Sequence, residues 1–147
     1  MPIEIIDTPF TLNLYGFSGI ARNKDYAGTA FSLMNKMWKI VKSSGLKNDG
    51  KNVWIYEPGD AVFAGVQLLE DPDGATSLEL KKVTISRYAR TRHVGPYKRI
   101  PETGRQLNDE IKKKGLVSGK PYIEIYGHWT EDETKLETEL ILALENW

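Results

Sequence analysis

A short internal repeat constrains the fold of this chain more than any other feature. The segment GLKNDGKNVWIY, which starts at Gly45, aligns without gaps with GLVSGKPYIEIY, which starts at Gly115. In each copy a glycine follows a stretch with helical periodicity, and an Ile-Tyr pair ends a strand-like run. A helix-end glycine followed by a strand is common, so the match by itself leaves coincidence open.

The elements around the repeat occur in the same order in both halves. Strands are predicted at FTLNLYGFSGIA, NVWIYE and AVFAGVQLLE, and again at KKVTISRYART, YIEIYGHW and LETELILAL. Helices are predicted over residues 25–44 and 100–115, and the polar segment DPDGATS separates the halves. We therefore expect an α+β fold in one domain, residues 1–147, made of two βαββ units at about 8–70 and 80–145. A pseudo-twofold axis would relate them, with two helices on one face of an antiparallel sheet and a ligand cleft on the other.

Composition narrows the classes of function. With 147 residues and 40% hydrophobic residues, the chain can bury one core. Lys+Arg and Asp+Glu number 20 each, so the broad positive field that favours direct nucleic-acid binding is missing. The start, MPIEIIDTPF, is unlike a signal peptide, and no apolar run is long enough to cross a bilayer. A cytoplasmic protein is expected.

Metal and cofactor chemistry finds little support in the sequence. There is no cysteine, and the two histidines, His93 and His128, have no metal-ligand spacing. No axial-ligand motif for haem can be recognised. We therefore expect neither a metal nor a cofactor.

The strand PYIEIYGHW places a carboxylate between two aromatic residues. Side chains alternate along a strand, so Ile123 and Ile125 face one side while Tyr122, Glu124 and Tyr126 face the other. The isoleucines are predicted to pack beneath the second helix. The tyrosines and the glutamate would then stand on the opposite face.

The repeat adds two residues of the first half to this surface. The shift of 70 residues matches Trp54 to Glu124 and Tyr56 to Tyr126. A carboxylate partly removed from water is costly unless it is paired or hydrogen-bonded, and aromatic faces attract cations by about 0.5–2 kcal/mol each. This combination favours a cationic, apolar and flat ligand. An exposed antiparallel face also carries Tyr, Trp and Glu for purely structural reasons, and on residue types alone both interpretations stay open.

The second half carries a series of motifs: in order, HVGPY (93–97), a helix, a Pro-x-x-Glu-x-Tyr strand from Pro121, and Thr138-Glu139-Leu140 in the last strand. These motifs resemble those of the GyrI-like small-molecule-binding family, the effector-binding domain of several multidrug-sensing transcription regulators. The resemblance covers the second half, while the first half agrees in layout. It implies a duplicated βαββ fold with an aromatic cleft, in which Glu124 meets cationic ligands and Tyr126 is the motif tyrosine.

Three further residues complete the predicted ligand-binding set. Glu139 has the opposite parity to the leucines of its strand, so it is expected on the cleft side or, alternatively, as an edge charge that limits aggregation. Tyr97, in the turn before the second helix, and Phe31, on the first helix, could close the cleft walls. Core packing is the favoured alternative for Phe31.

Two main functions and a third possibility follow. The first is a stand-alone module that senses or sequesters cationic amphipathic compounds. The second is a hydrolase of a reactive small molecule, such as a strained-ring alkylating toxin, with Glu124 as general base. The third is an interaction domain that once served a regulator. A homodimer or a separate DNA-binding partner is possible.

Overall fold

One antiparallel sheet of eight strands runs through the molecule, in the order β1-β6-β8-β7-β3-β4-β2-β5. The computed structural model describes residues 2–72 and 76–145, so part of the predicted link DPDGATS lies outside the described residues. The strands are β1 (Glu4–Ile6), β2 (Phe10–Ile20), β3 (Val53–Glu57), β4 (Ala61–Val66), β5 (Glu79–Ile85), β6 (Tyr88–Val94), β7 (Ser118–Tyr126) and β8 (Glu137–Leu144). The helices are α1 (Tyr26–Ser43) and α2 (Ile100–Lys113), with 3-10 turns η1 (Arg22–Lys24), η2 (Tyr97–Arg99) and η3 (Glu133–Lys135).

The strand order is symmetric about the contact between β3 and β7, as a duplicated βαββ fold requires. At this contact Trp54 lies directly opposite Glu124, and the flanking pairs are Val53–Ile125 and Ile55–Ile123. A shift of 70 residues exchanges the two flanking pairs and maps the central pair onto itself. The pseudo-twofold axis therefore passes between Trp54 and Glu124.

The ends of the two helices repeat the same hydrogen bonds. Gly45 and Gly115 both have positive φ, +63° and +71°, which lets the chain leave each helix in a left-handed turn. In both cases the leucine that follows donates its amide hydrogen to a helix carbonyl five residues earlier. These bonds are Leu46 to Val41 at 3.0 Å and Leu116 to Ile111 at 3.1 Å. The repeat found in the sequence is thus a repeat of structure.

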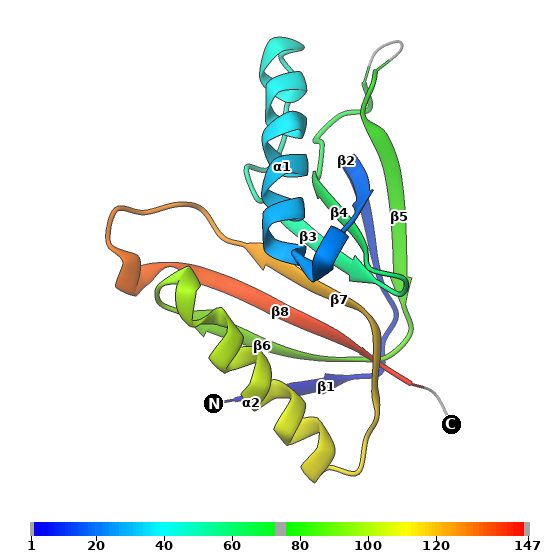
Figure 1. Cartoon of the computed structure of the whole chain (residues 1–147), viewed down its shortest axis with the longest axis vertical. Coiled ribbons are helices and arrows are strands. Elements are labelled where there is room, and N and C mark those ends of the chain that lie inside the picture. The colour runs from blue at the N-terminus through cyan, green and yellow to red at the C-terminus, as the bar shows by residue number, and fades with distance from the viewer. Residues whose placement is uncertain (1, 73–75, 146–147) are drawn as a thin grey trace.

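Both helices pack on the sheet face that carries Trp54 and Glu124. Side chains of α1 join Trp54 and Tyr56 in one apolar cluster, and side chains of α2 join Tyr122 and Tyr126 in another. Figure 1 shows α1 beside the strands of the first half and α2 across those of the second. The predicted α+β class and duplicated order are confirmed. The expectation that the helices and the aromatic surface lie on opposite faces is wrong.

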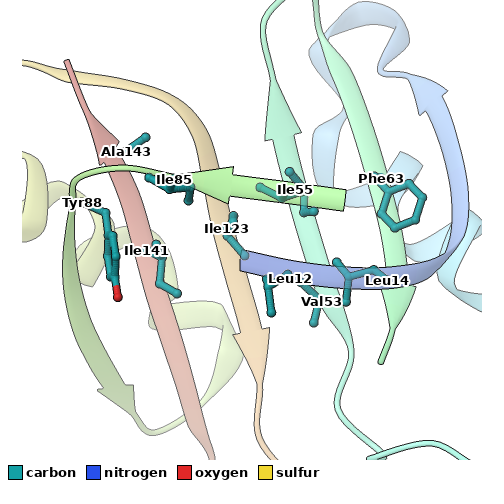
Figure 2. Close-up of a cluster of buried hydrophobic side chains, with 11 residues drawn as sticks. Leu12, Leu14, Val53, Ile55, Phe63, Ile85, Tyr88, Ile123, Ile141 and Ala143 are labelled. Carbon is teal, nitrogen blue, oxygen red and sulfur yellow. The ribbon is translucent and has the colours of Figure 1, made fainter. Parts of the chain in front are cut away.

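The sheet folds back over the face opposite Trp54 and Glu124, so strands and not helices cover that face. This explains why the predicted position of the helices was wrong. Ile123 packs there with Ile55, Phe63 and Ile141, and no helix residue belongs to this cluster. Figure 2 shows β2 and β5 crossing in front of β3 and β7, so that Leu12 and Ile85 close the layer. Strong twist lets a large sheet fold over in this way. The isoleucines therefore need no helix above them.

Two details of the strands also differ from the prediction. The run KKVTISRYART is not one strand but two, because the chain turns at Ser86 and Arg87 between β5 and β6. β5 pairs with β2 of the first half, and β6 pairs with β8 of the second. Short β1, which the sequence analysis did not predict, pairs with β6.

Candidate functional site

A buried carboxylate, that of Glu124, lies at the centre of the face that bears the helices. Its side chain is only 7% exposed. The hydroxyl of Tyr122 donates a hydrogen bond to Oε2 at 2.7 Å, and the hydroxyl of Tyr126 donates one to Oε1 at 2.6 Å. Alternation along β7 turns all three side chains to the same side. Each carboxylate oxygen therefore has a neutral donor.

Further aromatic rings enclose this tyrosine–glutamate group. The ring of Trp54 meets that of Tyr126 at a tilted angle of 64°, with centroids 4.9 Å apart. Tyr56 stacks on Tyr122 at 5.7 Å, and Tyr97 from η2 meets Tyr126 edge-on at 5.4 Å. Such offset and edge contacts are the favoured geometries of aromatic pairs. They fix the orientation of the two phenols that hold the carboxylate.

The carboxylate of Glu124 forms no ion pair within the described part of the chain. Among residues 2–72 and 76–145, no Lys, Arg or His nitrogen pairs with the Glu124 carboxylate within 4 Å. Burial, followed by the negative charge of Glu124, raises the pKa of Tyr56, Tyr122 and Tyr126 above the ordinary value for phenols. These tyrosines stay protonated well into alkaline conditions and remain donors rather than further negative charges.

A cavity of about 1060 Å³ lies above the carboxylate, between the two helices. β3 and β7 form its floor, α1 provides Phe31 and Met34 on one side, and η2 with the start of α2 provides Tyr97 and Ile100 on the other. Phe31 is 54% exposed at its rim. A concave, largely apolar site with a few convergent polar groups is the usual form of a small-molecule site.

Seven of the eight predicted ligand-binding residues line this cavity. They are Phe31, Trp54, Tyr56, Tyr97, Tyr122, Glu124 and Tyr126. Their position agrees with the prediction, and their binding role remains a prediction. For Phe31, the favoured alternative of core packing is wrong because its ring stands at the open rim.

Glu139 is the eighth predicted residue, and it does not reach the cavity. Its strand neighbour on β7 is Ile125, so its side chain lies on the face opposite Glu124. Its carboxylate approaches the Arg90 guanidinium at 3.7 Å. Its neighbour Leu140 has the opposite orientation and packs with α2. The cleft lies on that same side, and the expectation that Glu139 points into it is therefore wrong.

Sequence analysis missed several residues of the cavity wall, among them Tyr26, Met34 and Trp129. The ring of Tyr26 contacts that of Tyr56 edge-on at 6.1 Å. The position of Tyr26 could have been predicted from the sequence, because Tyr26 lies four residues before Ala30 and therefore on the same face of the helix. Trp129 gave none: it follows the end of β7 in a loop, where periodicity no longer indicates direction, and it is 71% exposed.

Residues 2–72 and 76–145 hold no group of three or more His, Cys, Asp or Glu side chains placed to bind a metal ion. No helix within these ranges is long and apolar enough to cross a membrane.

Comparisons with known proteins establish the fold. No family model matches the chain, and no curated protein matches it in sequence. Solved structures do match over nearly the whole length. The C-terminal domain of EcmrR superposes with a TM-score of 0.74 at 16% identity, covering 99% of this chain and 97% of that domain. SAV2435, solved with bound tetraphenylphosphonium, gives a TM-score of 0.65 at 15% identity, covering 99% and 95%.

A third similarity is to a hydrolase from Listeria innocua. Its TM-score is 0.59 at 18% identity, covering 97% of this chain and 91% of that one. At such identities the common feature is the fold. The chain has the α+β fold of GyrI-like effector-binding domains, as its second-half motifs predicted.

Proposed function

We propose that this protein binds flat, hydrophobic cations in the cleft between α1 and α2, with Glu124 as their counter-charge. The observation that carries the proposal is the buried carboxylate, hydrogen-bonded by two tyrosines and paired with no cation of residues 2–72 and 76–145. Sensing or sequestration would both use such a site. For sensing, a DNA-binding partner would have to recognise the bound state.

The energetics of the site favour a cation over a neutral ligand. An unpaired buried carboxylate pays a desolvation cost that hydrogen bonds offset only in part. A bound cation would supply the missing charge at short range in a water-poor cavity, where electrostatic attraction is stronger than in solvent. The rings of Trp54 and Tyr56 would add contact area and attraction of about 0.5–2 kcal/mol each.

The comparisons support this proposal over the hydrolase hypothesis only in part. SAV2435 holds a lipophilic cation, whereas other proteins of the same fold are hydrolases. Within the described ranges the cavity lining contains no Ser, Thr, Cys or His. A hydrolase built on this site would therefore have to use its carboxylates, tyrosines or lysines, with Glu124 as the general base.

The test compares two glutamates that receive the same substitution. Calorimetric titration with N-methylacridinium, and with neutral acridine at mildly alkaline pH, would be performed on the wild type, Glu124→Gln and Glu139→Gln. We expect Glu124→Gln to weaken N-methylacridinium at least tenfold, about 1.4 kcal/mol, and acridine less than about twofold. Glu139→Gln, on the other face, should bind both like the wild type.

Two results would overturn the proposal. One is that the wild type binds no cation saturably. The other is that Glu124→Gln keeps its affinity for cations but loses turnover of a strained-ring compound, measured as product by mass spectrometry. That second result would assign Glu124 the role of general base.

A further inference from the structure

The cleft continues from Glu124 under α2 into a second groove of about 950 Å³. Tyr122, Glu124 and Pro101 line both the main cavity and this groove. The groove then follows α2 past Gly104 and Arg105 toward the start of β7. A ligand at Glu124 could therefore extend into it without crossing a wall of the protein.

The pseudo-symmetry explains why the groove opens on only one side. On α1, Phe31 and Met34 line the main cavity with large apolar side chains. The residues 70 positions later, on α2, are Pro101 and Gly104. A Cβ atom added at Gly104 would meet nothing within 4 Å, so the space beyond the helix backbone is open. Where the first half has an apolar wall, the second half has a passage.

Two positive side chains line the groove: Arg105, which belongs to the groove alone, and Lys120, which also lines the main cavity. Within residues 2–72 and 76–145, neither forms an ion pair within 4 Å. Glu145 also lines the groove without pairing to either. A guanidinium presents paired donors that match a carboxylate, and an ammonium adds a second positive charge.

The uncharged polar side chains of the wall bond to the protein itself. Asn108 donates through Nδ2 to the Gly104 carbonyl at 3.1 Å. The Ser118 hydroxyl donates to Asn108 Oδ1 at 3.4 Å. The second bond joins α2 to the start of β7. Arg105 and Lys120 are left as the positive groups available to a ligand.

We infer that the cleft selects two-part ligands: a flat cation over Glu124, joined by a short arm to a carboxylate that binds Arg105 and Lys120 in the groove. The cationic half of this inference rests on the proposed function. The anionic half rests on Arg105, which lines only the groove, and on Lys120, which lines both spaces. Such a ligand is zwitterionic, and both of its charges meet an opposite charge of the protein.

Matched probes separate the two halves. They are acridinium ions whose ring nitrogen carries a carboxyalkyl arm, in several lengths, and the methyl ester of each. At the best arm length we expect the wild type to bind the acid at least about fivefold more tightly than the ester. The double substitution Arg105→Gln with Lys120→Gln should abolish this preference and change the affinity for the ester less than about twofold.

Two further variants test whether the effect is local. Lys98→Gln removes a positive charge that lines only the main cavity, and it should leave the acid-to-ester ratio unchanged. Gly104→Met copies Met34 of the first half and should remove the preference by filling the passage. All variants would be checked for folding by circular dichroism.

The outcomes distinguish the two proposals. If N-methylacridinium binds and depends on Glu124, but the acid gains nothing over its ester at any arm length, the groove inference is wrong and the proposed function stands. The groove inference is also wrong if the preference survives in the Arg105→Gln, Lys120→Gln variant. If N-methylacridinium does not bind at all, the proposed function fails first.

Discussion

At the scale of single residues, two phenol hydroxyls keep a carboxylate buried. Tyr122 and Tyr126 each donate to a different oxygen of Glu124. Hydrogen bonds to a charged group contribute more to stability than neutral ones, about 1.5–3 kcal/mol each. The two tyrosines therefore contribute both to the shape of the cleft and to the stability of the fold.

This gives a prediction for Tyr126→Phe. The substitution keeps the ring that contacts Trp54 and removes only the hydroxyl, so Oε1 of Glu124 loses its donor. We expect the free energy of unfolding, measured by urea denaturation, to fall by about 1.5–3 kcal/mol. Tyr97→Phe is the matched control, because the Tyr97 hydroxyl bonds to no residue within the described ranges. Equal losses for the two variants would contradict the role given to the Tyr126 hydroxyl.

At the scale of elements, replacing glycine by alanine at two positions of α2 and its C-terminal end should change the free energy of unfolding in opposite directions. Gly104 lies inside the helix, and Gly115 lies beyond its end at a φ of +71°. An added Cβ would contact nothing within 4 Å at either position, so the backbone alone decides the outcome. Gly104→Ala should raise the free energy of unfolding by about 0.5–1 kcal/mol. Gly115→Ala should lower it by about 1–2 kcal/mol.

Thermal and urea denaturation of both variants would measure this. Gly45→Ala, at the end of α1, provides an independent copy and should behave as Gly115→Ala does, since its φ is +63°. A stabilising effect of Gly115→Ala would show that the helix end rearranges, and would contradict the shared structure of the two caps.

The positions of the helices and most strands could be predicted from the sequence, whereas the way they cover one another could not. Periodicity located α1, α2 and the strands that flank them, and the repeat matched Trp54 to Glu124, which the sheet places side by side. Periodicity assigns a side chain to a face but does not state what covers that face. The pattern therefore predicts that Ile123 is buried, but not that strands rather than a helix cover it. β1 has only three residues, too few to show an alternating pattern.

At the scale of the whole molecule, each half depends on the other for its edge. β5 precedes the second half in sequence yet pairs with β2, and β1 precedes the first half yet pairs with β6. Both halves also supply side chains to the buried layer seen in Figure 2. Separating the halves would leave two strand edges of each half unpaired, and it would divide the buried hydrophobic layer between them.

We therefore expect that fragments 1–74 and 75–147 do not fold alone but form the native sheet when mixed. Circular dichroism and amide-proton NMR spectra of each fragment, and of the equimolar mixture, would test this. The full chain and a scrambled-sequence fragment serve as controls. A cooperatively folded single fragment would contradict the exchange of β1 and β5 between the halves.

The central pair of the sheet also bears on how such a cleft can arise. In a symmetric dimer of two identical halves, the residue on the axis would face its own copy. A glutamate would then meet a glutamate, and like charges directly opposite each other destabilise a sheet. Once both halves belong to one chain, the two positions can diverge, and here one holds the indole of Trp54 and the other the carboxylate of Glu124. Fusion into one chain thus allows a single charge at the symmetry centre, so that a bound ligand has one preferred orientation instead of two equivalent ones.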